Sequence, residues 1–466
     1  MDEETRPVNP RRRRKSKMEI FKEAYLPIII IALTALMIFI FFVGSLVKAI
    51  WPSTPSVDET GSSSSEPSED AYAAEIDSLL AQAAALAENY EYQAAADLID
   101  TFSGDLSAYP ALLAAQQEYL QMESNMVTWT PEQVTCLSMN MLIVDLETAL
   151  SDAEYGTSYN KNFITVDEFS AILEQLYDNG YILVNITDYA SCTTDDSGHI
   201  TCEAVELRLP VGKKPLVLIE TNVNYYSYMV DADRDGVADA GGDGFASKML
   251  IAEDGSITCE RTDSDGNVTT GAYDVVPILD AFIAEHPDFS YRGAKAVLAF
   301  SGYDGVFGYR TNADVATTLG EEFYNSEVAA ATELAAALKE DGYVLACYTY
   351  SNTDYSLKSA SEIQSEIRSW EAEVTPIVGE IDLFVFARNE IEDYTDSKFN
   401  ALSNGGYRYF VGFGSSVTGA EIGEGYFLQK RVNITGSGLY NTPSLYSDCF
   451  SASTVIDSAR GEVPVA

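Results

Sequence analysis

The sequence predicts an α/β fold in which parallel strands close into a barrel surrounded by helices. From Gln133 to about Arg460, short apolar segments alternate with amphipathic helical segments, and this alternation is typical of α/β domains. Seven or eight such units fit a closed barrel better than an open, doubly wound sheet. No Gly-x-Gly-x-x-Gly motif follows an apolar segment, so a dinucleotide-binding sheet is not indicated.

Each predicted strand is a short run of apolar or β-branched residues: residues 134–144, 181–186, 215–220, 295–300, 343–349, 382–386, 407–412 and 426–434. Each predicted helix carries apolar residues at spacings of three and four: residues 166–179, 274–285, 323–340, 358–373 and 395–403. In α/β barrels the functional residues lie where the strands end. We therefore expect a site just after residues 215–220, where the apolar run leads into a polar, aromatic tip.

The N-terminal segment predicts a membrane anchor. A basic tail, residues 1–24, holds six Lys or Arg between positions 11 and 17 and precedes an apolar run at residues 25–47. As a helix this run would rise about 34 Å, enough to cross a bilayer. The preceding positive charge places the N-terminus in the cytoplasm and the bulk of the chain outside the cell. We expect a single-pass signal anchor at residues 25–50; a cleaved signal peptide is the alternative, but the apolar run is too long for one.

Two segments with different compositions follow the anchor. Residues 51–70 are rich in Ser, Pro and acidic residues and predict a flexible linker. Residues 71–125 are Ala-rich with helical periodicity and resemble a tetratricopeptide-like helix pair. One pair is too few for a solenoid, so we expect a helical spacer that packs on the following domain, residues 126–466. The alternative is that residues 71–122 dock a partner protein.

The charge balance excludes one class of partner. The chain carries a formal charge of −44 from 72 acidic and 28 basic residues. Residues 1–50 hold nine basic and five acidic residues, whereas residues 51–466 hold 19 basic and 67 acidic ones. A surface this acidic repels nucleic acid, so no nucleic-acid partner is expected. Neutral or cationic polymers, divalent cations and basic proteins are compatible with it, and so is acidity kept for solubility alone.

Six cysteines in a chain of this length do not form a disulfide framework, and no Cys-x-x-Cys pair indicates a metal site. Cys192 and Cys202 flank a turn-rich segment. They either form a disulfide outside the cell or remain ordinary part-buried thiols.

Five segments resemble the polysaccharide deacetylase family, whose fold is also called the NodB-homology or chitooligosaccharide-deacetylase fold. They are residues 142–145, 163–181, 224–226, 292–294 and 308–311. The resemblance implies a distorted (β/α) barrel and metal-dependent removal of acetyl groups from N-acetylated polysaccharide. In this family one Asp and two His bind a divalent metal, which activates water, and a second Asp takes the proton.

The positions that match the family's active site hold other residues in this chain. Thr221 and Asn222 replace the Asp pair. Tyr348 and Asn352 replace the two His, and Asn140 replaces a His that often ends the first strand. Phenol and carboxamide groups are poor ligands for zinc and similar metals, and a threonine cannot act as a base near neutral pH. The resemblance therefore implies a catalytically degenerate member with no catalytic transition metal.

A relocated metal site is the alternative. The chain has only two histidines: His199 lies in an acidic turn and His286 at a helix end, so neither replaces the missing pair. Glu220, Cys347 and Asp354 lie next to the vacated positions and offer two carboxylates and a thiolate. However, consecutive strand residues face opposite sides, so Glu220 is expected to face away from the pocket that its neighbour faces.

Aromatic and amide side chains surround the vacated positions. Sugars bind by stacking on aromatic faces and by hydrogen bonding to polar groups. We therefore predict a glycan-binding groove formed by Tyr225, Tyr226, Tyr350 and Arg310. The alternative is that these tyrosines, among 29 in the chain, fill the barrel.

An acidic motif follows the same strand. Asp231, Asp233, Asp235 and Asp239 have the pattern Asp-x-Asp-x-Asp-Gly-x-x-Asp, which is typical of calcium loops with alternate carboxylates around a Gly turn. Position twelve is Gly242 instead of Glu, so the motif resembles the shorter extracellular calcium repeats. We predict a structural calcium ion here; an acidic surface turn is the alternative.

The expected function is that of a membrane-anchored, extracellular polysaccharide-deacetylase-like protein that binds or organises cell-wall polysaccharide without hydrolysing it. One alternative is an active metal-dependent N-deacetylase of peptidoglycan or a related polysaccharide with a relocated site. Another is a protein-docking scaffold that acts through residues 71–122.

Overall fold

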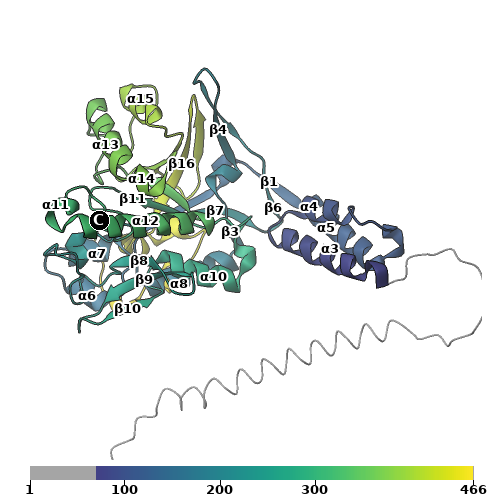
Figure 1. Cartoon of the computed structure of the whole chain (residues 1–466), viewed down its shortest axis with the longest axis horizontal. Coiled ribbons are helices and arrows are strands. Elements are labelled where there is room, and N and C mark those ends of the chain that lie inside the picture. Colours follow the sequence, from purple (N-terminus) through teal and green to yellow (C-terminus); the bar gives the residue numbers. More distant parts are fainter. Residues whose placement is uncertain (1–69, 465–466) are drawn as a thin grey trace, which may run out of the picture. The chain divides into compact units, whose positions relative to one another are not determined.

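Seven parallel strands close into a barrel (Figure 1) in the computed structural model, which describes residues 70–464. In order around the ring they are β11 (Val297–Phe300), β12 (Val344–Cys347), β13 (Leu383–Val385), β14 (Tyr409–Phe413), β16 (Tyr426–Asn433), β2 (Thr135–Asn140) and β7 (Lys214–Thr221). The ring closes because β7 pairs with both β2 and β11. The described chain therefore has the (β/α) barrel that the sequence predicts.

Two short strands extend this sheet beyond the ring. The remaining predicted strand, β3 (Tyr181–Leu183), pairs in parallel with β7, and β15 (Ala420–Gly423) pairs antiparallel with β16. The segment at 181–186 is thus a strand as expected, but it lies outside the closed ring.

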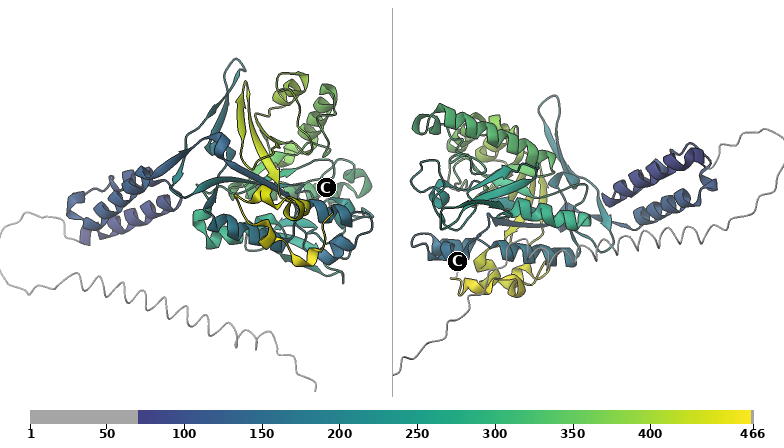
Figure 2. Two further views of the ribbon diagram at one scale, coloured as in Figure 1. Left: turned by 180° about the vertical axis from the view of Figure 1, so that it is seen from behind. Right: turned by 60° about the horizontal axis from the view of Figure 1, so that its bottom comes forward.

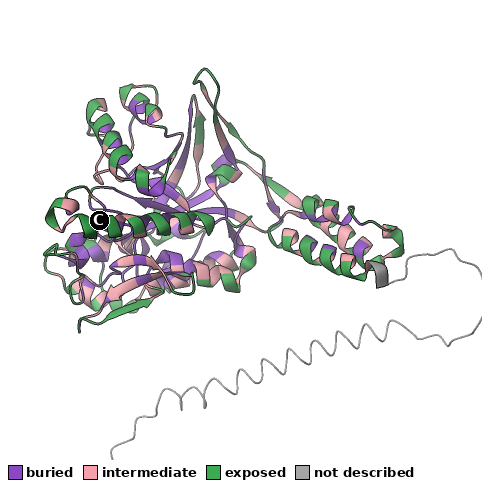
Figure 3. Ribbon diagram, in the orientation of Figure 1, coloured by how far each residue is buried: buried purple, intermediate pink, exposed green. Residues whose placement is uncertain are grey.

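Side chains of the barrel strands alternate between two hydrophobic cores, as a period of two requires. Cys136 and Val217 belong to the core that fills the barrel. Their neighbours Leu137 and Leu218 belong to the core between the barrel and its helices. Figure 3 shows buried residues along the barrel strands and on one face of the surrounding helices. Each strand therefore presents only every second residue to the barrel interior and its mouth.

Five predicted helices contribute buried residues to the outer core (Figure 2): α8 (Val166–Asp178), α10 (Val275–Glu285), α12 (Glu321–Glu340), α13 (Ala360–Glu373) and α15 (Ser397–Asn404). A capping box between Thr165 and Glu168 starts α8. The Glu168 carboxylate also pairs with Arg460, Nη2 to Oε2 at 2.5 Å, and both side chains are fully buried. This ion pair ties the C-terminal segment to the start of α8.

Three antiparallel elements are additions to the predicted pattern, and one of them pairs β1 (Met126–Trp129) with β6 (Leu207–Pro210). β8 (Lys248–Ile251), β9 (Ile257–Thr262) and β10 (Val268–Gly271) form a three-stranded sheet inserted between β7 and α10. β4 (Ala190–Thr194) and β5 (Ile200–Ala204) form a hairpin. Cys192 and Cys202 lie opposite each other in this hairpin and form a disulfide. The disulfide resolves the two alternatives that the sequence leaves open.

Three helices precede the barrel: α3 (Asp70–Glu88), α4 (Tyr92–Ile99) and α5 (Pro110–Ser124). They share a small core of their own that includes Ala83, Ile99 and Leu112. Between α3 and α4, the Tyr90 ring stacks on the ring of Tyr291, with centroids 6.0 Å apart, and the Tyr90 hydroxyl donates to the Asp288 carbonyl at 2.7 Å. These contacts join the helices to the segment ahead of β11.

The remaining elements are short: α6 (Leu146–Ser151), α7 (Gly156–Asn162), α9 (Ser227–Val230), α11 (Val315–Thr318), α14 (Thr375–Val378), α16 (Gly436–Asn441) and α17 (Ala452–Val455). Within residues 70–464, no helix is both long enough and apolar enough to cross a bilayer. The predicted basic tail, the anchor at 25–50 and nearly all of the linker lie outside the described residues.

Candidate functional site

Polar side chains from two neighbouring strands meet at the mouth of the barrel, where the strands end. Asn140 ends β2 opposite Thr221, which ends β7. The Asn140 Oδ1 atom accepts hydrogen bonds from Thr221 Oγ1 at 2.9 Å and from Asn222 Nδ2 at 2.8 Å. The first three positions that the resemblance singles out are therefore in direct contact.

Asn352 brings the loop after β12 into the same network. Its Nδ2 atom donates to Asn222 Oδ1 at 2.9 Å and to the hydroxyl of Tyr226 at 3.2 Å. The Tyr226 hydroxyl in turn donates to Asn222 Oδ1 at 3.0 Å and lies 2.9 Å from Ser301 Oγ. We call Asn140, Thr221, Asn222, Tyr226 and Asn352 the amide cluster.

Tyr348 lies apart from the amide cluster. Its hydroxyl donates to the Ala387 carbonyl at 3.0 Å, and its ring centroid lies 5.8 Å from the guanidinium carbon of Arg431. Arg431 is fully buried and donates through Nη2 to the Phe386 carbonyl at 2.8 Å. Tyr348 therefore belongs to the packed barrel interior, and the structure brings four of the five positions together.

The backbone around the amide cluster adopts uncommon conformations. Asn222 and Asn352 have positive φ angles of 62° and 49°, and Thr349 has a φ of 61°. A left-handed conformation is tolerated by Asn but is rare for a β-branched residue such as Thr. Conformations of this kind concentrate at functional sites, where the surrounding structure holds them in place.

The amide cluster is electrically neutral. Asn and Thr side chains do not titrate in the physiological range, and burial raises the pKa of the Tyr226 phenol well above its ordinary value. Both Asn140 Oδ1 and Asn222 Oδ1 accept two hydrogen bonds, so their lone pairs are already occupied. Within the cluster as described, neither a general base nor a set of strong metal ligands is present.

The four predicted groove residues occupy different environments. Tyr225 is fully buried in the outer core, with its hydroxyl 3.8 Å from Cys259 Sγ. Tyr350 packs partly buried against the same core. Arg310 is buried and donates to the carbonyls of Asp304 at 3.1 Å and Tyr225 at 2.9 Å. Of the four, Tyr226 alone has a hydrogen bond to the amide cluster.

Two exposed tyrosines flank Tyr226 and are not among the predicted residues. The Tyr226 ring stacks on Tyr228 at 5.8 Å and on Tyr303 at 5.4 Å between centroids. The residues Tyr228 and Tyr303 are 38% and 39% exposed. The signal that could have revealed them is an aromatic residue just after a strand end: Tyr303 follows β11 and Tyr228 follows β7 by a few positions. We call these three residues the tyrosine column.

A pocket of about 220 Å³ adjoins the tyrosine column. Ser227, next to Tyr226 in the chain, and Asp304, next to Tyr303, both line it, together with Arg310 and Asn312. Ser227 donates from its backbone nitrogen to Asp304 Oδ2 at 2.7 Å. The pocket therefore places polar groups beside exposed aromatic faces.

The alternative metal ligands do not converge. Glu220 is fully buried, and its register partners Leu298 and Met139 belong to the outer core. The next residue, Thr221, instead faces Asn140 at the mouth. Burial, followed by the nearby carboxylate of Asp274, raises the pKa of Glu220 well above its ordinary value. Cys347 is buried in the outer core and Asp354 accepts from Ser356 and Asn389. These groups therefore form no common site in the described chain.

Both histidines lie away from the amide cluster. His199 is exposed in the turn between β4 and β5, where its backbone nitrogen donates to Asp195 at 3.0 Å. His286 follows α10, and its ring lies 4.3 Å from that of Tyr177 and 4.6 Å from that of Phe282. Neither imidazole can stand in for a metal ligand at the mouth.

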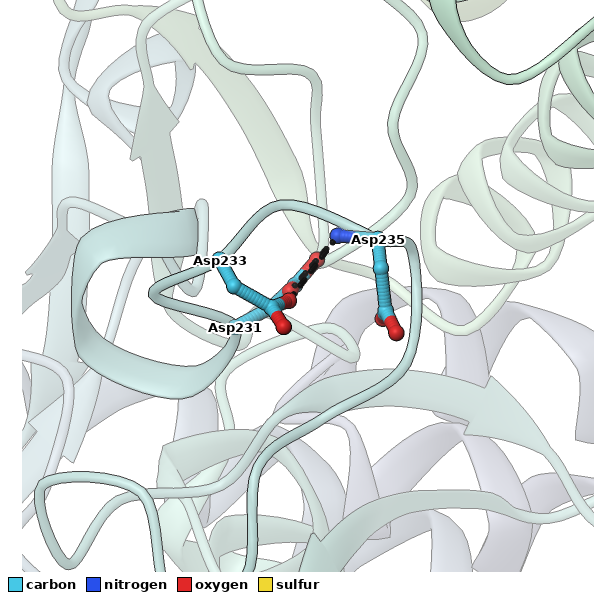
Figure 4. Close-up of side chains that lie close together, drawn as sticks. All are labelled: Asp231, Asp233 and Asp235. Atoms are coloured by element: carbon cyan, nitrogen blue, oxygen red, sulfur yellow. Dashed lines mark hydrogen bonds between the residues drawn. The ribbon is translucent and has the colours of Figure 1, made fainter.

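Three of the four predicted calcium ligands lie together after α9 (Figure 4). Oxygen atoms of Asp231, Asp233 and Asp235 lie within 4.8 Å of one another. Asp231 is buried, and this burial raises the pKa of its carboxyl group. Asp239 is not part of this group: its Oδ2 accepts from the backbone nitrogen of Ala232 at 2.8 Å. The structure therefore presents three carboxylates to a cation, and Asp239 closes the loop.

Comparison with known proteins assigns no family to the chain. No protein-family description matches the chain, and no curated protein matches it. The chain is similar to a solved structure, the Streptococcus pyogenes deacetylase PplD in complex with acetate, with a TM-score of 0.34 and 12% identity over 66% of this chain and 94% of that chain. A likeness this distant carries no argument about function. The fold assignment rests on the closed ring of seven parallel strands.

Proposed function

We propose that the chain is a deacetylase-like barrel that binds polysaccharide at the mouth of the barrel without hydrolysing it. The observation that carries this proposal is the neutral amide cluster, which occupies the strand ends where the resemblance implies an acid pair and two imidazoles. Metal-assisted hydrolysis needs ligands with free lone pairs and a proton acceptor. In the cluster, the amide oxygens of Asn140 and Asn222 each accept two hydrogen bonds, and no carboxylate or imidazole is present to take a proton.

The tyrosine column supports glycan binding. Tyr228 and Tyr303 expose ring surface on either side of Tyr226, and flat aromatic faces suit the apolar faces of sugar rings. The nearby pocket is also lined by Asn312 and Asp314, which are not buried, and their polar groups would be available to sugar hydroxyls. The mouth therefore combines stacking surface with hydrogen-bonding groups, as saccharide sites require.

The proposal also places this domain outside the cell, held by the predicted anchor at residues 25–50, where its ligand would be cell-wall polysaccharide. The disulfide between Cys192 and Cys202 supports an oxidising compartment, because disulfides are rare in the cytosol.

A structural calcium ion at Asp231, Asp233 and Asp235 belongs to the same proposal. The ion would balance three clustered carboxylates. It would stiffen the loop that begins directly after α9, which carries Tyr228. Its role is therefore to support the tyrosine column, with no part in chemistry.

Measuring acetate release tests whether the chain hydrolyses N-acetylated glycans. The purified full chain is incubated with hexa-N-acetylchitohexaose and with peptidoglycan fragments, each in the presence of zinc, manganese or cobalt. We expect no acetate above the protein-free blank. Acetate release that scales with protein concentration and is abolished by Thr221→Ala would refute the proposal.

Calorimetric titration with the same oligosaccharides tests binding. We expect Tyr303→Ala and Tyr228→Ala each to weaken binding about five- to tenfold, because each removes one stacking face. The matched control is Tyr273→Ala, whose phenol lies beside the outer antiparallel sheet, 3.1 Å from Thr269 Oγ1. Equal affinities of all three variants and the unaltered chain would show that the tyrosine column does not bind these glycans.

A further inference from the structure

A second cavity lies at the opposite end of the strands from the mouth. This groove of about 500 Å³ lies where α4 and α5 meet the barrel domain, beside the segment that precedes β11. In Figure 1 these helices lie next to β1 and β6. We call it the basal groove; residues from the helical spacer and from the barrel domain both line it: Tyr90, Tyr92, Asp97, Asp188, Glu206 and Tyr291.

The basal groove holds more negative than positive charge. Its lining includes five carboxylates and two guanidinium groups. Both guanidinium groups already have partners: Arg208 pairs with Glu123, and Arg292 Nε lies 3.6 Å from Glu91 Oε1. The three other carboxylates have no cationic side chain within 4.0 Å in the described chain: Asp97, Asp188 and Glu206. The lining of the groove therefore carries a net negative formal charge.

The hydrogen bonds of these three carboxylates come from neutral donors. Asp97 Oδ1 accepts from the Gln93 amide at 2.7 Å, and Glu206 Oε1 accepts from the Thr128 hydroxyl at 3.1 Å. The third, Asp188, accepts from a backbone nitrogen. None of these donors carries a positive charge that would offset the charge of the carboxylate. The three groups come from α4, from the 3-10 helix η4 (Ile186–Asp188) and from the residue before β6, so they line a groove and do not converge on one ion.

Three tyrosines that are each at most 8% exposed line the groove, and we call Tyr90, Tyr92 and Tyr291 the tyrosine floor. Tyr90 stacks on Tyr291, and Tyr92 meets the Tyr90 ring edge-on at 6.0 Å between centroids. The Arg292 guanidinium already lies 5.0 Å from the centre of the Tyr291 ring. Aromatic faces attract organic cations, and more strongly where water is partly excluded. Val205, 36% exposed, adds apolar surface to the lining, which suits the methylene stem of a long basic side chain.

We propose that the basal groove binds a lysine- or arginine-bearing peptide segment of a partner protein. Unpaired carboxylates on the walls and tyrosine rings on the floor match an ammonium or guanidinium group on an apolar stem. A groove of about 500 Å³ has room for more than one such side chain, so an extended segment fits it better than a single small ion. The proposal is separate from glycan binding, because the groove and the mouth share no residues.

Fluorescence polarisation with the purified full chain tests this proposal. The probe is a labelled octapeptide of alternating lysine and glycine, and its control carries acetyl-lysine at the same positions. We expect the double variant Asp97→Asn/Glu206→Gln to bind the lysine peptide about tenfold more weakly, since both exposed carboxylates face the groove. The acetylated peptide should bind neither protein measurably.

The matched control makes the same change in charge at a site outside the groove. Glu321→Gln/Glu322→Gln removes two exposed carboxylates from the first turn of α12 and should change the affinity by less than about twofold. Equal losses in the two double variants would overturn the proposal, because the peptide would then respond only to net charge. So would undetectable binding of the lysine peptide to the unaltered chain at millimolar concentration.

Substitution of Tyr92 tests whether the tyrosine floor contributes to peptide binding. Tyr92→Phe keeps the ring and should bind the lysine peptide like the unaltered chain, whereas Tyr92→Leu should weaken binding about threefold. Thermal melts of both variants separate loss of the ring face from loss of the fold. If Tyr92→Leu melts like the unaltered chain and binds equally well, the tyrosine floor takes no part in recognition and the proposal fails in this form.

Discussion

Asn352 donates a hydrogen bond from Nδ2 to Asn222 Oδ1 at 2.9 Å, across 130 positions of sequence. This contact joins the loops that follow β7 and β12. A hydrogen bond between two neutral amides thus links the ends of two barrel strands.

This relationship predicts a gain of metal binding. The quadruple variant Asn140→His/Thr221→Asp/Asn222→Asp/Asn352→His places one metal-binding Asp, two His and a base at four positions that contact one another in the amide cluster. We expect it to bind cobalt with a visible absorption band, while the unaltered chain shows none. A folded variant that binds no cobalt would show that the strand ends of this barrel lack the geometry for a metal.

Calcium should stabilise the folded chain through the loop at Asp231. With a dissociation constant of about 1 mM, typical of extracellular sites, about 10 mM calcium adds roughly 1.4 kcal/mol to the free energy of unfolding. We expect Asp233→Asn to lose this increment in denaturant titrations. Asp254→Asn, in the turn between β8 and β9, is the matched control and should keep it. If calcium adds the same free energy of unfolding to both variants, the ion binds at a different place.

The stability of the chain should fall with rising pH because of Glu220. Burial raises its pKa in the folded state well above the ordinary value, so the folded chain keeps a proton that the unfolded chain releases above about pH 4.3. The free energy of unfolding then decreases with pH, by up to about 1.4 kcal/mol per unit, until pH reaches the raised value. We expect Glu220→Gln to reduce this decrease.

Urea titrations at pH 5 and pH 8 measure how the free energy of unfolding changes with pH. The exposed Glu203→Gln is the control and should behave like the unaltered chain. If Glu220→Gln leaves the difference between the two pH values unchanged, the proton is not held at this carboxyl.

The buried ion pair between Arg460 and Glu168 predicts a large stability loss. Arg460→Met leaves the Glu168 carboxylate buried without its cation, which costs about 3–5 kcal/mol. Replacing both residues, as Arg460→Met/Glu168→Gln, should recover part of that loss. The exposed Arg388→Met should change the free energy of unfolding by less than about 0.5 kcal/mol. A double variant less stable than Arg460→Met would argue against pairing as the source of the loss.

Much of the barrel is predictable from the sequence because its strands and helices carry regular apolar periods. All eight predicted strands and all five predicted helices from residue 134 onward are present, with ends shifted by a few residues. The inserted sheet of β8, β9 and β10 was not predicted, because its strands are only four to six residues long and β10 is mostly exposed. Its two hairpin turns contain Asp254-Gly255 and Asp265-Gly266, a dipeptide that is a recognised hairpin signal.

The residues of the mouth are harder to predict than its position. Counting from the strand ends brings Asn140, Thr221, Asn222 and Asn352 to the same rim, and the structure shows these four side chains in contact there. It cannot separate Tyr225 from Tyr226: Tyr225, with a φ of 48°, lies in the outer core, and Tyr226 reaches the cluster. Tyr228 and Tyr303 depend on loop packing between distant segments, for which a single sequence holds no periodic signal.

The neutrality of the amide cluster has a further consequence. None of its side chains gains or loses a proton between mildly acidic and mildly alkaline media, since the phenol of Tyr226 is held in its protonated form by burial. Contacts made there should keep their strength as the surroundings acidify, even while the carboxylates elsewhere on the surface respond. If a ligand binds at the amide cluster, its affinity should therefore be the same on the two sides of neutral pH.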